Sequence, residues 1–150
     1  MISTAVHEPI VARVFEKLGG RSTLRTDVFS DADLARVVRG RIRLSVLGHL
    51  ERAGFSKQEI HTFVIPARTW RRRQTKKEPL TIEESDRVVR LARIQAAAED
   101  VFHDPDKANR WLREPLGVLD GKSALEIAQT ESGARLIEQL LAKIDWGVAA

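Results

Sequence analysis

Apolar residues recur every three or four positions along most of this chain, and the alternation typical of strands is nearly absent. Such spacing gathers the apolar side chains on one face of a helix. The clearest stripes are Leu44, Leu47 and Leu50; Val88, Leu91, Ala92 and Ile94; and Ile137, Leu140, Leu141 and Ile144. The pattern predicts helices over 11–18, 31–39, 42–53, 57–64, 66–74, 82–102, 105–114, 124–129 and 131–146. The chain is therefore expected to be all-α.

Capping residues predict where several of these helices begin. Three Ser or Thr residues are followed three positions later by Glu, which forms a capping box that satisfies free amides at a helix start. The pairs are Ser56 with Glu59, Thr81 with Glu84, and Ser123 with Glu126. Ser30, Thr130 and Asp104 ahead of Pro105 are further candidate N-caps. The segment 114–121 contains one Pro and two Gly and is expected to be a loop.

Composition narrows the class of protein. The 150 residues contain no Cys, which excludes a disulfide, a thiolate nucleophile and a Cys-based zinc site. The longest apolar runs are only a few residues, far from the roughly 20 that a spanning helix needs. The first residues lack the basic and apolar regions of a signal peptide. A cytoplasmic protein is expected.

Charge is distributed unevenly along the chain. Residues 1–80 contain 16 Lys and Arg against 8 Asp and Glu, whereas residues 81–150 contain 9 against 13. This asymmetry favours two different partners, the first of them a polyanion, although uneven but inert surface charge is the alternative. We expect two domains, 1–80 and 81–150, with the long helix that begins at Thr81 linking them.

The most basic segment follows a short connection between two predicted helices. Pro66 can begin the second helix because the amide that it lacks would be unpaired there. On a helical wheel Trp70 lies opposite Arg68 and Arg72, so Trp70 would face Ile60 and Phe63 of the preceding helix. This arrangement predicts a helix-turn-helix with cations directed at DNA, and a solvated basic helix is the alternative. The predicted DNA-binding residues are Arg68, Thr69, Arg71, Arg72 and Lys76.

No pattern in the sequence predicts catalysis. The four His residues are widely separated and form none of the short-range pairs of a zinc or catalytic motif. Gly19 and Gly20 are not followed by the Lys and Ser or Thr of a phosphate-binding loop. We expect no catalytic residue, no metal and no cofactor. A carboxylate pair assembled only by the fold is the alternative.

From Leu80 onward the chain resembles the toxin-binding domain of the Xre/MbcA/ParS antitoxin family. The resemblance rests on four motifs in order: Glu84-Ser85-Asp86-Arg87, Trp111-Leu112, Gly121-Lys122-Ser123-Ala124-Leu125-Glu126, and Thr130-Glu131-Ser132-Gly133-Ala134. Upstream, Arg68, Thr69, Trp70, Arg72 and Arg73 resemble the helix-turn-helix of that family. The chain departs from the pattern at Trp146, where Tyr or His is expected, and at Ser123-Ala124, where Thr-Pro is expected.

The resemblance implies an antitoxin of a type II toxin-antitoxin system. Proteins of this family are partners of RES-domain toxins, which act on NAD, either degrading it or transferring its ADP-ribose to a target. The implied C-terminal domain covers the NAD cleft of the toxin, and the helix-turn-helix represses the promoter of its own operon. The antitoxin itself is not expected to be an enzyme.

The end of the last predicted helix is where toxin contact is expected. Ala134, Ile137, Leu141 and Ile144 form a stripe that can pack on the chain's own domain, and Gly147 permits a left-handed exit from the helix. Trp is enriched in interface hot spots, although Trp146 could instead fold back onto its own core. The predicted toxin-binding residues are Ile144, Asp145, Trp146, Gly147 and Val148.

Helix-turn-helix proteins usually bind two half-sites, so a homodimer formed through the N-terminal half is expected. Apolar residues there that could form the contact are Val14, Phe15, Val28, Phe29, Val37 and Val38. The alternative to an antitoxin is a stand-alone helix-turn-helix transcription regulator whose C-terminal module dimerises or binds a small ligand.

Overall fold

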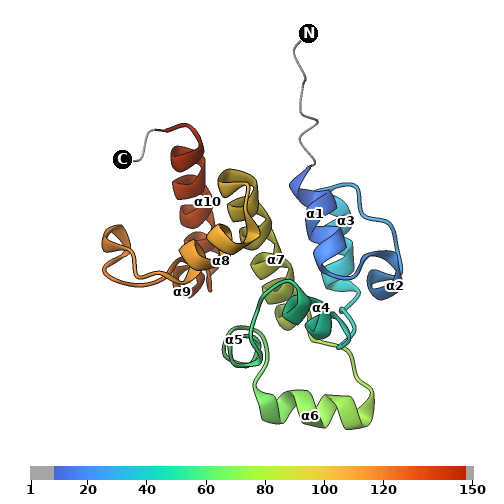
Figure 1. The fold of residues 1–150 in the computed structure, drawn as a ribbon. Coiled ribbons are helices and arrows are strands. Elements are labelled where there is room, and N and C mark those ends of the chain that lie inside the picture. Colours follow the sequence, from blue (N-terminus) through green and yellow to red (C-terminus); the bar gives the residue numbers. More distant parts are fainter. Residues whose placement is uncertain (1–8, 148–150) are drawn as a thin grey trace.

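The structure, a computed structural model, describes residues 9–147 and is all-α over that range, as predicted (Figure 1). Its only pairing of the β type among these residues is an isolated bridge between Leu116 and Lys122. The helices are α1 (Ile10–Lys17), α2 (Gly20–Leu24), α3 (Asp31–Arg39), α4 (Val46–Arg52), α5 (Lys57–Phe63), α6 (Ala67–Lys76), α7 (Ile82–Phe102), α8 (Pro105–Arg113), the 3-10 helix η1 (Gly117–Leu119), α9 (Ala124–Ile127) and α10 (Glu131–Asp145).

The predicted helix starts are confirmed wherever a capping side chain was identified. All three capping boxes form with both of their hydrogen bonds. The side chains of Ser30, Asp104 and Thr130 also accept hydrogen bonds from amides in the first turn of their helices. These interactions are local in sequence, which is why the sequence alone could identify them.

The predicted start of the fourth helix, at residue 42, is wrong by four residues. α4 begins at Val46, because Ile42 is engaged by the segment around the start of α7. The Ile42 amide donates to the Ser85 hydroxyl at 2.9 Å, and its carbonyl accepts from the Leu80 amide at 2.9 Å. These tertiary hydrogen bonds replace the helical ones that the apolar spacing had suggested. The short helix α2 was not predicted at all, since five residues carry no periodic pattern.

The long helix α7 lies at the centre of the molecule and contacts α1, α3, α8 and α10 (Figure 1). It was expected to link two modules that could pack on each other. Its contacts reach both parts of the chain, and its buried apolar residues are Val88, Val89, Leu91, Ala92, Ile94, Ala96 and Ala98. The helix is therefore part of the core of both the N-terminal and the C-terminal part.

Side-chain contacts between segments far apart in sequence join the two parts. Glu99 of α7 binds Arg13 and Lys17 of α1, at 3.2 and 2.5 Å. Arg113 of α8 binds Glu59 of α5, with the Nε–Oε2 distance at 2.9 Å. The predicted division between residues 80 and 81 stays a prediction. Within residues 9–147, no helix combines the length and apolar character that crossing a membrane requires.

Packing of the N-terminal half corrects one expectation about dimerisation. Val14, Val28 and Val37 are buried in the core of their own chain and cannot form a contact with a second copy. Phe29, by contrast, is 84% exposed. Phe15 and Val38 are partly buried against the core.

Candidate functional site

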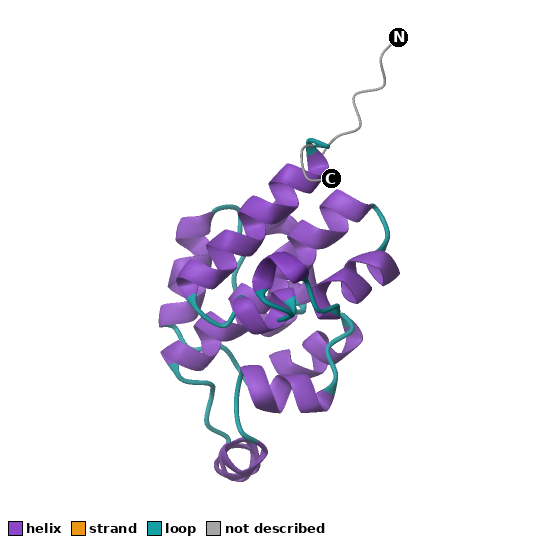
Figure 2. Cartoon of the chain, turned by 90° about the vertical axis from the view of Figure 1, so that its left-hand side faces the viewer, coloured by secondary structure: helices purple, strands orange, loops and turns teal. Residues whose placement is uncertain are grey.

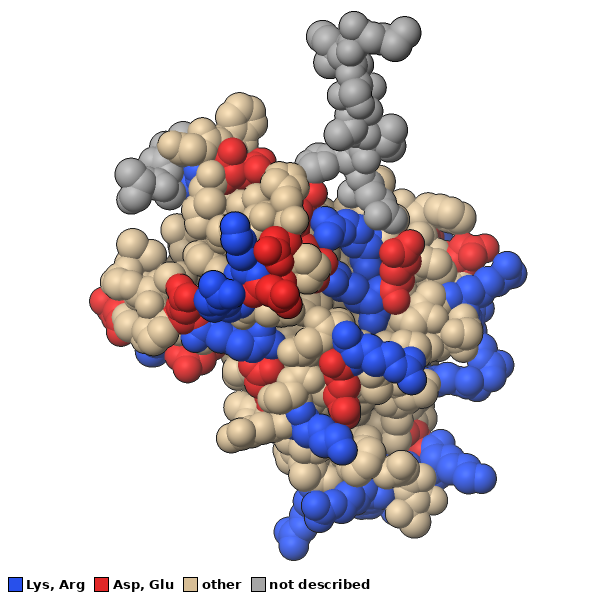
Figure 3. Space-filling view, in the orientation of Figure 1, with Lys and Arg blue, Asp and Glu red and all other residues tan. Residues whose placement is uncertain are grey.

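All five residues predicted to bind DNA lie on α6, which projects from the body at one end of the molecule (Figures 1 and 2). Figure 3 shows Lys and Arg side chains gathered over this helix. Arg68, Arg71, Arg72 and Lys76 are exposed, whereas Thr69 is half-buried. In the part of the chain that the structure describes, none of these four cations forms an ion pair with a carboxylate, so their charge faces solvent.

The inner side of α6 is held by Trp70 and Arg73. Trp70 is half-buried, and its ring centroid lies 5.9 Å from that of His61 on α5. Trp70 and Ile60 line one hollow, which Phe63 does not line, so the predicted contact of Trp70 with both residues stays a prediction. Arg73 belongs to the basic run but does not face solvent with it, because it is buried against the side chain of Glu84 at the start of α7.

The carboxylate of Glu84 has two structural roles: it binds Arg73 of α6 and it caps α7. Burial disfavours its charged form, but the hydrogen bond from the Thr81 amide and the interactions with Arg73 outweigh burial, so the pKa of Glu84 lies below its ordinary value. The same carboxylate completes the capping box of α7. The orientation of α6 is thus tied to the first turn of the central helix.

The predicted toxin-binding residues lie at the end of α10. Trp146 is 81% exposed, so the alternative in which it folds back onto its own core is wrong. Gly147 has a φ of 70°, the left-handed conformation that was predicted. Ile144 is half-buried and Asp145 is exposed. Val148 lies outside the described residues.

A second exposed apolar side chain, which sequence reasoning missed, lies between α8 and α9. Val118 of η1 is 78% exposed. Its turn is closed by hydrogen bonds from the Leu116 amide to the Lys122 carbonyl and from the Gly121 amide to the Leu116 carbonyl. The only signal in the sequence was an apolar residue inside a segment rich in Pro and Gly, and that signal does not distinguish a buried from an exposed position.

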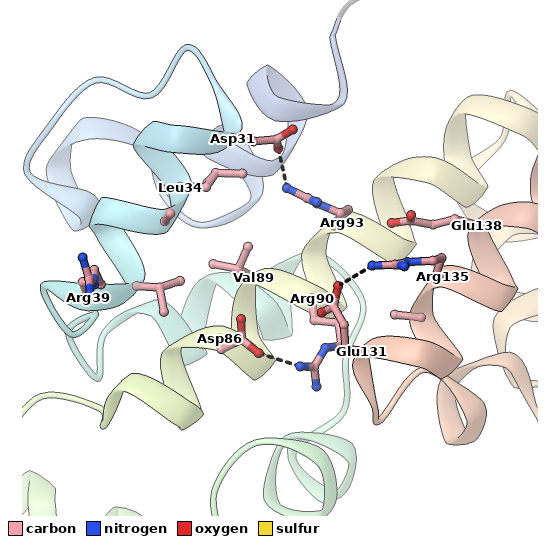
Figure 4. A pocket seen from close by; sticks show the side chains of 13 residues that line it. Asp31, Leu34, Arg39, Asp86, Val89, Arg90, Arg93, Glu131, Arg135 and Glu138 are labelled. Atoms are coloured by element: carbon pink, nitrogen blue, oxygen red, sulfur yellow. Dashed lines mark hydrogen bonds and ion pairs between the residues drawn. The ribbon is translucent and has the colours of Figure 1, made fainter.

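A hollow of about 520 Å³ lies between α3, α7 and α10 (Figure 4). Its charged residues are largely matched in ion pairs: Asp86 with Arg90, Asp31 with Arg93, and Glu131 with Arg135. Burial raises the pKa of Glu138, which lies beside Arg93 and Arg135. Four Arg and four carboxylates line this hollow, so its charge favours neither a polyanion nor a cation.

The described residues contain no group of three or more His, Asp or Glu side chains that could hold a metal ion. His61 directs Nδ1 at the Ile65 carbonyl, at 3.0 Å, and His49 binds the Thr23 hydroxyl, at 3.0 Å. Both imidazoles thus have structural partners in the N-terminal part.

Two family models match the chain. Residues 33–93 match the antitoxin Xre-like helix-turn-helix domain, and residues 97–147 match the antitoxin Xre/MbcA/ParS C-terminal toxin-binding domain. The two matched segments meet inside α7, the helix that both parts of the structure share.

Curated relatives include antitoxins of several bacteria. The chain is 39% identical over 84 residues to Antitoxin Xre of Pseudomonas putida, covering 56% of this chain and 53% of the relative. It is 36% identical over 85 residues to Antitoxin Xre of Yersinia enterocolitica, covering 56% and 57%. It is 32% identical over 82 residues to the Prs ADP-ribosylating antitoxin of Sphingobium sp., covering 49% and 52%.

The matched region thus spans little more than half the length of these curated relatives. Within it, the order of the two domains agrees with the fold. A match to the Xre-like helix-turn-helix that ends in α7 is followed by a match to the toxin-binding domain that begins in the same helix, and the chain therefore contains both domains of the Xre/MbcA/ParS antitoxins.

Proposed function

We propose that this chain is the antitoxin of a type II toxin-antitoxin pair, which binds a toxin through its C-terminal domain and promoter DNA through α6. The observation that carries the proposal is the exposure of Trp146, at 81%, at the end of α10. A large aromatic side chain left in water at the end of a toxin-binding domain is the type of residue that anchors an interface. α6 and the end of α10 lie at opposite ends of the molecule, so both partners can bind at once (Figure 1).

The proposed partner is a RES-domain toxin that degrades NAD or transfers its ADP-ribose. One relative is named an ADP-ribosylating antitoxin, which supports chemistry that consumes NAD. In this proposal Trp146 enters the toxin's NAD cleft, with Ile144, Asp145 and Gly147 lining the approach. An indole ring can occupy a cleft built for a flat nucleotide base, because both present an apolar face.

The proposed DNA function is repression of the antitoxin's own operon by a homodimer. The ten residues of α6 span about 15 Å, a length that the major groove accepts. Arg68 and Arg72 lie one helical turn apart on the outer face, where guanidinium groups can reach phosphates and guanine edges. The antitoxin supplies binding energy only and no catalytic group.

Co-expression with the neighbouring gene, which the proposal expects to encode a RES-domain toxin, tests the proposal. The tagged antitoxin should co-purify with the toxin and suppress its consumption of NAD, measured by following NAD in the purified complex. A toxin alone that consumes NAD, together with a folded antitoxin that neither captures nor inhibits it, would overturn the proposal.

The hollow of about 520 Å³ favours a second candidate, a transcription regulator that responds to a small ligand. It is lined by α3 of the N-terminal part and α10 of the C-terminal part, so a ligand there could alter how the parts pack. If this candidate is right, the substitution Ala134→Leu, which narrows the hollow, should change the affinity of the purified protein for promoter DNA. Unchanged DNA binding in that variant would leave the antitoxin as the function.

A further inference from the structure

A second cationic surface surrounds a hollow of about 300 Å³ between the end of α2, the end of α3 and the segment before α4. Four arginines line it: Arg25, Arg36, Arg41 and Arg43. All four are exposed, and no carboxylate lines the hollow with them. Arg36 is paired with the Asp33 carboxylate at 3.1 Å. Among the described residues, Arg25 and Arg43 form no ion pair, so their guanidinium groups can bind an anion.

Two of the four arginines have an unusual backbone. Arg25 has a φ of 64° and Arg41 a φ of 61°, the left-handed region that residues other than Gly rarely adopt. Such conformations persist where the surrounding structure enforces them, and they often occur at binding sites. Here both residues line the same hollow, although they lie 16 positions apart in the sequence.

Arg41 joins this hollow to the DNA-binding helix. Its Nε donates to the Leu80 carbonyl at 2.9 Å, and its Nη2 donates to the Pro79 carbonyl at 3.3 Å. Those two residues closely follow the basic end of α6, at Lys76 and Lys77. The cationic surface therefore continues from α6 into the hollow, and Figure 3 shows Lys and Arg side chains from the bottom of the view up its right-hand side.

We infer that the hollow lined by the four arginines is a binding site for backbone phosphates of the DNA that flanks the stretch contacted by α6, with Arg25 and Arg43 as the phosphate-binding side chains. The inference rests on the proposed DNA function and extends its surface beyond the helix-turn-helix. Guanidinium groups bind phosphate oxygens in a bidentate manner, and a large share of the hydrogen bonds in protein–DNA complexes goes to phosphate. The hollow positions the protein on DNA, whereas α6 reads the sequence.

The salt dependence of DNA affinity tests this site. Each phosphate contact contributes about 0.9 to the slope of log affinity against log salt, so the loss of two contacts lowers the slope by about 1.8. The test uses the full chain and a fluorescently labelled duplex of mixed sequence, and binding is measured by fluorescence anisotropy.

In the double variant Arg25→Asn with Arg43→Gln, the salt slope should fall by about 1.8. At physiological salt, the Kd should rise on the order of thirtyfold. The variant Arg25→Lys with Arg43→Lys keeps both charges and should retain most of the slope.

The control is Arg110→Gln with Lys143→Gln, which removes the same charge from exposed positions of the C-terminal part. Its slope should stay near that of the wild type. If the hollow variant and this control lose the same amount of slope, the effect comes from net charge alone and the proposed site is wrong. An unchanged slope in the Arg25 and Arg43 variant would also overturn it.

The proposed DNA function fails separately if the wild type and the variant Arg68→Gln with Arg72→Gln bind DNA equally weakly. A hollow variant that keeps its DNA affinity but loses the toxin would assign the surface to a protein partner instead.

Discussion

The guanidinium of Arg73 on α6 binds the carboxylate of Glu84 in the first turn of α7, and both side chains are about nine-tenths buried. Glu84 also accepts a hydrogen bond from the Thr81 amide at 2.8 Å. One carboxylate therefore caps the central helix and holds α6, the proposed DNA-binding helix. Arg73 is buried in this ion pair, so it positions α6 and is not among the residues proposed to contact DNA.

The first prediction separates Arg73 from its exposed neighbour Arg72. Arg73→Met leaves the Glu84 carboxylate buried without its partner and should lower the free energy of unfolding by about 3 kcal/mol. Arg72→Met removes the same group from an exposed position and should change stability by no more than about 0.5 kcal/mol. Urea denaturation followed by circular dichroism measures both values. Equal effects of the two substitutions would contradict the assigned role of Arg73.

The second prediction concerns acid stability. Because the pKa of Glu84 is lower in the folded state than its ordinary value of 4.5, its contribution to stability is present above that pH. The contribution is lost as the pH falls through the folded-state pKa. Glu84→Gln should therefore flatten the decline of stability below pH 4.5, measured by denaturation at several pH values, whereas Glu83→Gln at the exposed adjacent position should not. A decline as steep in Glu84→Gln as in the wild type would rule this out.

The third prediction separates the two binding functions. Changing Arg68 and Arg72 together to Ala should abolish binding to promoter DNA, because each base-specific guanidinium contact contributes about 1–3 kcal/mol. Neutralisation of the toxin should stay intact, since that surface lies at the other end of the molecule. Gel-shift assays and growth rescue measure the two functions. A shift of promoter DNA by the double variant at moderate salt would show that α6 is not the recognition helix.

The fourth prediction tests the toxin contact at Trp146. Trp146→Ala should weaken inhibition of the toxin by at least about 2 kcal/mol, roughly thirtyfold in affinity. Removal of residues 146–150 should have the same effect while helical content by circular dichroism is unchanged. Leu136→Ala, at another exposed apolar position of α10, is the control and should inhibit normally. Full neutralisation by the truncated protein would move the contact to η1 or to the body of α10.

The fifth prediction assigns the expected homodimer to Phe29, the exposed member of the apolar residues in the N-terminal half. Phe29→Ser should convert the dimer to a monomer at tens of micromolar, measured by light scattering, because a buried aromatic side chain dominates a small interface. Val118→Ser, an equally polar change at an exposed site of the C-terminal part, should leave the dimer intact. A monomeric wild type would contradict dimerisation through this half.

The sequence predicted those parts of the fold that local interactions determine. The capping boxes at Ser56 and Thr81 formed as expected, because their partners lie within one helical turn. The start of α4 was missed because Ser85, more than forty residues away, binds Ile42. Nothing in the sequence set Arg73 apart from the other arginines of α6, because its partner Glu84 is brought to it only by the fold.

The candidate sites show the same division between local and tertiary information. The basic helix and the aromatic residue near the end of the last helix could be recognised from residue types alone. Val28 and Phe29 are adjacent and both apolar, yet the first is 3% exposed and the second 84%. The Arg25 and Arg43 hollow likewise brings together segments that no short motif spans.

Because α7 belongs to both cores, its sequence constrains how such genes can recombine. An exchange at residues 80 and 81 would deliver a foreign α7 whose buried face must still fit α1 and α3. An exchange inside α7 would instead join two half-helices from different genes, and their buried faces would have to line up along one helix. If the chain has the proposed function, recognition of the promoter and recognition of the toxin are therefore expected to be inherited together, and both should change by substitution more readily than by domain shuffling.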